Sequence, residues 1–326
     1  MKDFCILGSG ISGSTIANLL SKRYSLEIFD KARGVGGRSS NKRFLKKLSF
    51  DHGLQYLSPK NKKFKIFVKK LTKIGVLKVW KGNHLDYNFK NAASLNKFIG
   101  KNGNSDIPKY LIGSIKVNLQ ASIKKINFIK NYWIITLENE KKCYFKNLII
   151  TTPFPQTKLL SGKYIPKKIK NLNVKMEPNI TVMAIYKKSS LPVVSSIKFN
   201  DKIISWAANE NTKSRYKSKL TLWTIQSNIK WAKKYINNYK DNKNMVSRLL
   251  LARFNLLTGF KNKNLVFKNI HGWKYSYNLK STNMFSYWSN KHNLGICGDW
   301  FIGPKAEHAW LSANDLFKTI KKSPLK

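Results

Sequence analysis

The sequence has few acidic residues, few cysteines and no long apolar run. It holds 15 Asp and Glu against 62 Lys and Arg in 326 residues, a formal net charge of +47. Cys5, Cys143 and Cys297 form no CxxC pair, and isolated thiols in apolar runs are usually reduced and buried. The longest apolar runs fall short of the roughly 18 residues that a membrane-spanning helix needs. Because a strand begins almost at once after Met1, we expect no signal peptide and a cytoplasmic protein.

Arginine is also scarce, since lysine supplies nearly all of the positive charge. One interpretation is a polyanion partner, either nucleic acid or an acidic membrane face. However, Lys, Asn and Ile are abundant along the whole chain, and no segment interleaves arginine with aromatic residues as a base-reading surface does. We therefore favour compositional drift over specific nucleic-acid binding, and expect weak, salt-sensitive adhesion to polyanions in either case.

The clearest motif lies near the start of the chain. An apolar run of strand length, residues 4–7, leads into Gly8-Ser9-Gly10-Ile11-Ser12-Gly13, and apolar residues at helical spacing follow. A second apolar run, residues 26–29, ends in Asp30. An ordinary strand-to-helix turn would explain the glycines alone. The order of strand, glycine turn, helix, strand and acid instead favours a dinucleotide site.

The residues of this motif have distinct roles in such a site. Gly8 allows the turn, Gly10 lets the backbone approach a pyrophosphate, and Gly13 lets helix and strand pack closely. Ile11 and Ser12 begin the helix, whose unpaired N–H groups and positive dipole end face the phosphates. The carboxylate that ends the second strand can accept hydrogen bonds from ribose hydroxyls.

Two loops follow, and they carry a family resemblance. Lys31-Ala-Arg-Gly-Val-Gly36-Gly37-Arg38 and Asp51-His-Gly-Leu-Gln55-Tyr56, together with the glycine motif, resemble the FAD-binding end of flavin amine-oxidase-type oxidoreductases. More narrowly they resemble renalase and its bacterial relatives. Three later stretches extend the resemblance, at Trp206–Arg215, His271–Tyr275 and Gly298-Asp299. Asp30 stands where glutamate is commonest, Lys274 replaces an arginine, and a Pro-Gly pair before Arg215 is absent.

The resemblance implies an α/β fold with a Rossmann-type FAD-binding domain of the p-hydroxybenzoate-hydroxylase type and a second, α+β substrate domain. The FAD-binding domain would comprise residues 1–60, 98–160 and 265–326, and the substrate domain residues 61–97 and 161–264. Within the second domain, apolar patterns predict strands at 180–186, 203–208 and 220–225 and helices at 231–239 and 245–257. A β-meander is predicted at 115–152.

FAD, bound noncovalently, is the cofactor that the resemblance implies. The implied contacts come from the glycine motif, from the acid that ends the second strand and the lysine after it, and from the two loops that follow. A strand residue beside the adenine and the C-terminal Gly-Asp turn beside the ribityl chain complete the set. They are Gly8, Gly10, Ile11, Ser12, Gly13, Asp30, Lys31, Gly36, Gly37, Arg38, Gln55, Ile123, Gly298 and Asp299.

On the substrate side, aromatic walls can hold a planar ring against the flavin, and Gln or His can hydrogen-bond an amide. The candidates are Gln55, Tyr56, Trp206, His271 and Trp273, although core packing is the commoner role of any one tryptophan. No catalytic acid or base is assigned, and the five histidines have no metal-ligand spacing.

Three functions stay open from the sequence. A renalase-like enzyme would oxidise dihydronicotinamide isomers of NAD(P)H to NAD(P)+ and pass the electrons to O2, giving H2O2. An FAD-dependent amine oxidase would share the fold and act on an amine. A basic protein that holds FAD structurally and binds nucleic acid or anionic membrane is the third, and loss of activity is possible for any of them.

Overall fold

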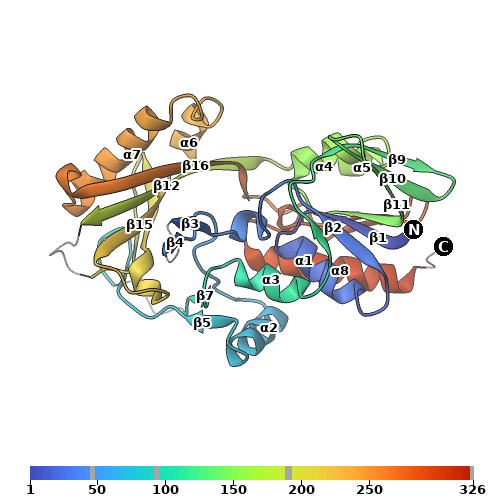
Figure 1. Cartoon of the computed structure of the whole chain (residues 1–326), viewed down its shortest axis with the longest axis horizontal. Helices are drawn as coiled ribbons and strands as arrows, with labels where there is room; N and C mark the ends of the chain where they lie inside the picture. Colours follow the sequence, from blue (N-terminus) through green and yellow to red (C-terminus); the bar gives the residue numbers. More distant parts are fainter. Residues whose placement is uncertain (45–47, 92–95, 188–192, 324–326) are drawn as a thin grey trace.

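The computed structural model describes residues 1–44, 48–91, 96–187 and 193–323, which form two main sheets with helices around them (Figure 1). The larger sheet has eight strands in the order β17-β18-β11-β1-β2-β8, and β10 and β9 continue from β11. Its strands are β1 (Lys2–Leu7), β2 (Leu26–Phe29), β8 (Val117–Asn118), β9 (Ile123–Ile129), β10 (Tyr132–Leu137), β11 (Lys142–Ile150), β17 (Tyr287–Ser289) and β18 (Leu294–Ile296).

The centre of this sheet is parallel and buried. β1 runs parallel to both β2 and β11, and β18 runs parallel to β11. β9, β10 and β11 pair in antiparallel fashion, which confirms the predicted meander from Ile123 onward. Its expected first strand is instead β8, which runs parallel to β2. Because successive side chains of a strand point to opposite faces, each strand of the parallel part contributes to two cores.

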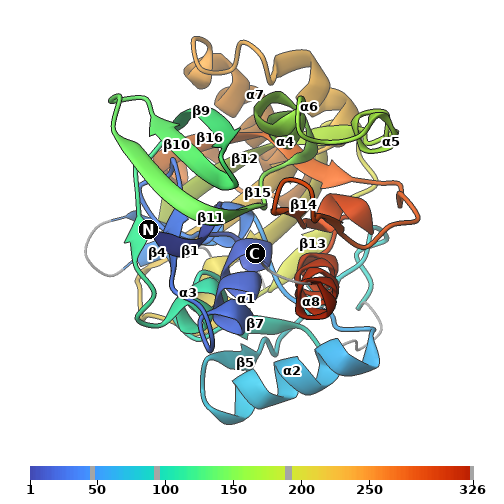
Figure 2. The same ribbon diagram turned by 90° about the vertical axis from the view of Figure 1, so that its right-hand side faces the viewer.

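One face of the parallel sheet is covered by helices. Phe4 and Ile6 of β1 pack against α1 (Ile11–Leu20) and α8 (Ala306–Lys322) in one apolar cluster. α1 and α8 lie side by side (Figure 2), and α3 (Asp106–Ile112) packs against α1.

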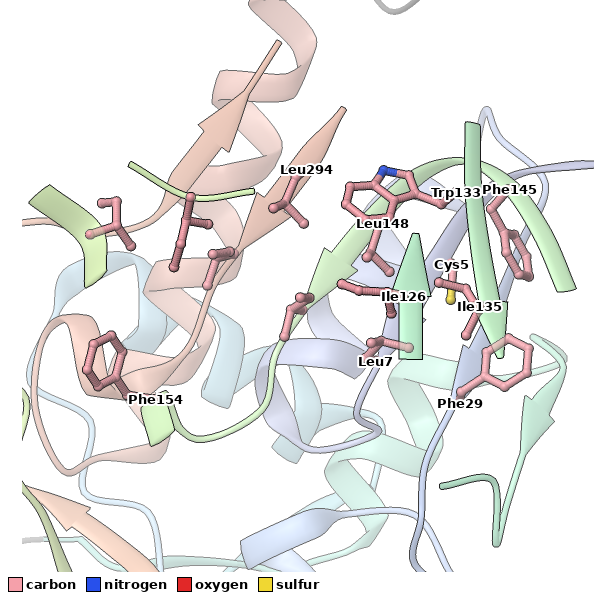
Figure 3. Packing of buried hydrophobic residues seen from close by; sticks show 14 of the residues in the cluster. Cys5, Leu7, Phe29, Ile126, Trp133, Ile135, Phe145, Leu148, Phe154 and Leu294 are labelled. Atoms are coloured by element: carbon pink, nitrogen blue, oxygen red, sulfur yellow. The ribbon is translucent and has the colours of Figure 1, made fainter. Parts of the chain in front are cut away.

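The opposite face is covered by the meander. Figure 3 shows the buried residues that join the two layers, which are Cys5, Leu7, Phe29, Ile126, Trp133, Ile135, Phe145 and Leu148. The short helices α4 (Phe154–Ser161) and α5 (Lys167–Lys170) follow the meander. Both contribute buried residues to the same cluster, namely Phe154 and Ile169.

The second sheet has six strands in the order β16-β12-β15-β14-β13-β6. They are β6 (His84–Leu85), β12 (Met176–Lys187), β13 (Ser196–Lys198), β14 (Ile204–Asn209), β15 (Leu220–Ser227) and β16 (Leu265–Asn278). On one face Val182 and Ala184 pack with α6 (Ile229–Tyr235) and α7 (Lys243–Thr258). The three strands and two helices predicted here from apolar patterns are confirmed, with ends that differ by a few residues.

The other face of the six-stranded sheet turns toward the rest of the molecule. Met183 and Ile185 of β12 pack there with Leu48 and Phe50 of the hairpin β3 (Lys42–Phe44) and β4 (Leu48–Phe50). A further unit comprises α2 (Lys62–Lys73), β5 (Leu77–Val79) and β7 (Phe98–Gly100).

β16 bears on the predicted domain boundaries. Residues 265–278, which were assigned to the first domain, pair with β12 along nearly their whole length. The division into domains stays a prediction, and this pairing argues for placing its last boundary near residue 278. No helix in the described ranges combines the length and apolarity that crossing a membrane requires.

Candidate functional site

The glycine turn after β1 combines two close approaches with one open position. A Cβ on Gly13 would lie 1.9 Å from the Gly8 carbonyl oxygen, and one on Gly8, whose φ is +105°, would lie 2.6 Å from Thr151 Oγ1. The packing of α1 against β1 therefore requires both glycines. At Gly10 the nearest atom to such a Cβ is the Gly36 carbonyl oxygen, 3.8 Å away. Protein packing does not require glycine at position 10, whereas a ligand lying over the start of α1 would.

Asp30 is held against this turn. Its Oδ2 accepts the Ser9 N–H at 2.8 Å and the Ser9 hydroxyl, and its Oδ1 accepts the Ala32 N–H at 2.9 Å. The Ala121 N–H donates to the Asp30 carbonyl at 2.9 Å, which brings Ile123, two residues further on, to the same edge of the sheet. Lys31, next to the carboxylate, is exposed.

The loop of residues 34–38 folds over the glycine turn. Gly36 and Gly37 have φ values of +121° and +51°, and the Gly36 N–H donates to the Ser9 carbonyl at 3.1 Å. A Cβ on Gly37 would lie 3.4 Å from Gly10 Cα. From the other side, Ser12 Oγ donates to the Ala309 carbonyl at 3.1 Å, so α8 docks at the start of α1.

Arg38 and Asp299, which are 261 residues apart in the chain, form a bidentate ion pair with N–O distances of 2.8 and 2.5 Å. Arg38 also donates to the Ser276 carbonyl at 2.9 Å, and the Gly298 N–H donates to Ser312 Oγ at 2.9 Å. The two residues expected to contact the phosphates and the ribityl chain therefore contact each other, at the junction of the loop and the C-terminal turn.

A buried group of four charged side chains anchors the following turn, residues 51–56. Lys213 Nζ lies 2.9 Å from Asp51 Oδ2 and 3.0 Å from Glu210 Oε1, and all three side chains are fully buried. Arg215 Nη1 lies 2.6 Å from Asp51 Oδ2. We call Asp51, Glu210, Lys213 and Arg215 the buried ion cluster. Two cations and two carboxylates leave it with no net charge when all four are ionised.

The two carboxyl groups of the buried ion cluster respond differently to burial. Burial raises the pKa of Asp51, but Lys213 and Arg215 more than offset this and hold the pKa at about 2. Burial also raises the pKa of Glu210, and neighbouring Asp51 adds to that rise, so its pKa stays above the usual value. Asp51 is therefore the firmly ionised partner, and Glu210 is the carboxyl group that protonates more readily.

The turn of residues 51–56 lies on the six-stranded sheet. Gln226 Nε2 donates to the Gly53 carbonyl at 2.8 Å, and Trp273 Nε1 donates to the His52 carbonyl at 2.8 Å. Gln55 bonds to carbonyl oxygens of its own turn and accepts a hydrogen bond from Lys213 at 3.4 Å. The side-chain amide of Gln55 is thus committed within the protein and does not face an open site.

The sheet presents a row of side chains to this turn. Trp206 pairs with Gln226, Gln226 with Thr181, and Thr181 with His271 across four neighbouring strands. Residues in register share a face of the sheet, and strands are spaced by about 4.8 Å, so the row spans roughly 14 Å between its ends.

Aromatic and imidazole rings gather at each end of the row. Tyr56 and Trp206 have ring centroids 5.6 Å apart. At the other end the His271 and Trp273 centroids are 4.3 Å apart, and His52 lies 4.9 Å from His271. Four of the five predicted substrate-side residues therefore lie in two pairs, one at each end.

The two histidines are uncharged at neutral pH. Burial lowers the pKa of His52 to about 3, with further lowering from His271 and Lys42. Burial lowers the pKa of His271 to about 4, and Lys42 again contributes. Positive charge and low solvent access thus act together at this end of the row.

Sequence reasoning missed the residues that lie between the turn of residues 51–56 and the six-stranded sheet. Thr181 and Gln226 are polar residues in otherwise apolar strands, and both are buried, which is a signal that could have drawn attention to them. Lys213 and Arg215 were noted only as part of a resemblance. Asp51 was noted in the same way, as part of a turn.

Comparisons with known proteins agree with this architecture. Residues 6–71 match the family described as an NAD(P)-binding Rossmann-like domain. A protein from Exiguobacterium sp. 255-15 assigned as a protoporphyrinogen oxidase superposes with a TM-score of 0.75 at 10% identity over 98% of both chains. Cyclohexylamine oxidase from Brevibacterium oxydans IH-35A gives 0.73 at 9% identity over 98% of both chains. An engineered putrescine oxidase gives 0.70 at 10% identity over 99% of both. The expected fold, a Rossmann-like domain with a second sheet-based layer, is confirmed.

Proposed function

We propose that this protein is an oxidoreductase that binds FAD noncovalently across the glycine turn. The observation that carries the proposal is the glycine turn, where packing requires Gly8 and Gly13 but a Cβ on Gly10 would meet only the Gly36 carbonyl oxygen, 3.8 Å away. The 34–38 loop folds over this turn, and its Arg38 pairs with Asp299. The backbone at Gly10 and Ser12 would hold the pyrophosphate, Asp30 a ribose, and Ile123 the adenine side. FAD, when bound, supplies a hydride acceptor.

The C-terminal turn supports noncovalent binding. Cys297 precedes Gly298, yet its side chain is fully buried, and burial raises the pKa of its thiol well above the ordinary range. A thiol in that state is a poor nucleophile. Acid precipitation checks this point, because the yellow colour should stay in the supernatant.

A dihydronicotinamide isomer of NAD(P)H is the substrate class that we propose, with O2 as the electron acceptor and H2O2 as the product. The positive charge near His271 disfavours a second cation and suits an anionic nucleotide. The neutral imidazole of His271 can hydrogen-bond a carboxamide. Oxidation of an amine is the second candidate, because cyclohexylamine oxidase and putrescine oxidase share the fold.

The cofactor is tested by substituting Gly10. Gly10→Ala adds a methyl group that the protein can accommodate but that blocks close approach of a pyrophosphate, so FAD affinity should fall by at least about tenfold while stability stays within about 1 kcal/mol. Gly34→Ala is the matched control, since a Cβ there meets nothing within 4 Å. Absence of a flavin band in the purified wild-type protein reconstituted with FAD would overturn the proposal.

The substrate is tested by anaerobic mixing of the FAD-loaded protein with 6-dihydro-NAD and, separately, with a panel of amines. Bleaching of the flavin within seconds by the dihydronicotinamide alone is the expected result. Bleaching by an amine and not by the dihydronicotinamide would establish the second candidate instead.

A further inference from the structure

A cleft of about 440 Å³ lies beside the free edge of β16, the outermost strand of the six-stranded sheet. Four lysines line it, and we call them the cleft lysines: Lys42 of β3, Lys240 before α7, Lys243 at the start of α7, and Lys268 of β16. Two neighbouring elements, α7 and β16, and the distant strand β3 thus bring four positive charges to one concave surface. The volume is within the range of small-ligand sites.

The charges of the cleft lysines are not neutralised by the protein. Among the residues that the structure describes, no Asp or Glu lines the cleft. The ion pairs among the described residues use other lysines, namely Lys2, Lys116, Lys124, Lys146, Lys213 and Lys233.

Lys42 is partly buried, and its partner is an uncharged amide. It donates to Asn269 Oδ1 at 3.2 Å. Partial burial lowers its pKa, and the charges of Arg33 and Lys243 add to the effect. Gathering like charges in this way costs free energy, which a bound anion would offset.

The start of α7 adds to the positive potential of the cleft. α7 has 16 residues, no acidic residue in its first turn and no side-chain cap from Asn242. Its unpaired N–H groups and its positive dipole end therefore act in the same sense as the cleft lysines. Asn244 and Ser247 of the first turns also line the cleft. The side-chain amide of Asn244 can donate to an anion, whereas the Ser247 hydroxyl donates to the Asn244 carbonyl.

The cleft adjoins the His271 end of the row on the sheet. Asn269, which lines the cleft and binds Lys42, is two residues before His271 on β16, so the two side chains share a face of the strand. The charge of Lys42 lowers the pKa of both His52 and His271. Lys42 is thus part of the cleft and also acts on the row.

We infer that this cleft is an anion site that binds the phosphates of the nucleotide substrate beside the His271 end of the row. The assignment to the substrate rests on the proposed function, whereas the binding of an anion does not. The cleft lysines are positioning residues: they hold the phosphates and take no part in the transfer of hydride.

The first experiment measures by calorimetry the affinity of the FAD-saturated protein for inorganic pyrophosphate. Lys243→Gln combined with Lys268→Gln removes two charge-assisted contacts to the anion and should weaken binding by at least about tenfold. Lys65→Gln with Lys69→Gln on α2 removes the same charge from exposed positions and should leave binding within about twofold. Rising KCl should weaken wild-type binding.

The second measurement is anaerobic reduction by 6-dihydro-NAD. The cleft variant should need at least about tenfold more substrate for half-maximal rate, with an unchanged rate at saturation. Failure of pyrophosphate to bind, or equal binding by the cleft and control variants, would overturn the anion site. Pyrophosphate binding that depends on the cleft lysines, without any flavin reduction, would leave the site intact and count against the proposed substrate alone.

Discussion

Removal of the cation at the centre of the buried ion cluster should destabilise the protein strongly. Lys213→Met keeps the length and apolar stem of the side chain but leaves Asp51 and Glu210 with Arg215 as the only cation. Lys213, Asp51 and Glu210 are fully buried, so water cannot replace the lost partner. Breaking a buried pair in this way typically costs about 3–5 kcal/mol, a large part of a usual stability of about 5–15 kcal/mol.

A double-mutant cycle separates the ion pair from packing effects. Glu210→Gln retains an oxygen that can accept from Thr224, whose hydroxyl lies 2.6 Å from Glu210 Oε1, and should cost only about 1 kcal/mol. In Lys213→Met/Glu210→Gln the second unpaired carboxylate is gone, so the double variant should be more stable than Lys213→Met alone. The coupling energy should reach at least about 1 kcal/mol.

The pH dependence of the same variants adds a second criterion. Without Lys213 the pKa of Glu210, already raised by burial, should rise further. A group whose folded pKa exceeds its unfolded value loses its stabilising effect as the pH rises through the folded pKa. The deficit of Lys213→Met should therefore be smaller at pH 5 than at pH 8.

Urea unfolding followed by tryptophan fluorescence measures all of these free energies. Lys116→Met is the matched control, because Lys116 forms an ion pair with Glu27 at 3.2 Å but its side chain is 63% exposed, and such pairs contribute less than about 1 kcal/mol. If Lys213→Met is no more destabilising than Lys116→Met, or if the double variant shows simple additivity, the cluster does not anchor the turn as argued.

Two further predictions follow from the site. The folded pKa values of about 3 for His52 and about 4 for His271 lie below the ordinary value of 6.5, so the unfolded state takes up protons first on acidification and stability should fall as the pH drops from about 6.5 toward 4. His271→Gln should flatten this slope in urea unfolding at a series of pH values, and an unchanged slope would contradict the assignment. Asp299→Asn removes one charge from the bidentate pair with Arg38 and should weaken FAD binding by about tenfold. Flavin fluorescence measures this affinity. Asp315→Asn, in helix α8, which follows Asp299, is the control and should leave the affinity unchanged.

The parts of the fold that follow local patterns could be predicted from the sequence. The glycine motif identified β1, α1 and β2 because turn geometry and apolar spacing are short-range features. The antiparallel meander was predictable for the same reason, since its strands are adjacent in the chain. β16 was not predicted as part of the six-stranded sheet. It pairs with β12, far earlier in the chain, so that Val182 lies opposite Ile270, and no local pattern in the sequence specifies that partner.

The candidate site depends on pairings of that long-range kind. Trp206 and His271 were chosen one at a time for their chemistry, and only the strand register shows that Gln226 and Thr181 connect them. Gln55 was expected to face a ligand, but its position between Asp51 and Lys213 could not be inferred without knowing that the turn lies on a second sheet. Sequence reasoning thus identified the residue types of the site and not their neighbours.

The net charge of +47 takes on a different meaning once the charges are placed. An even excess of lysine over the surface would select no ligand, because solvent screens each exposed charge. The buried ion cluster has two acids for its two cations and contributes no net charge, while the cleft of Lys42, Lys243 and Lys268 has no acid among its lining residues. Two of the 15 acids thus balance the fully buried cations, and the cleft is left positive. Under the function proposed above, a substrate beside His271 would meet cations on one side and neutral imidazoles on the other, and these conditions favour an anionic nucleotide over an ammonium ion.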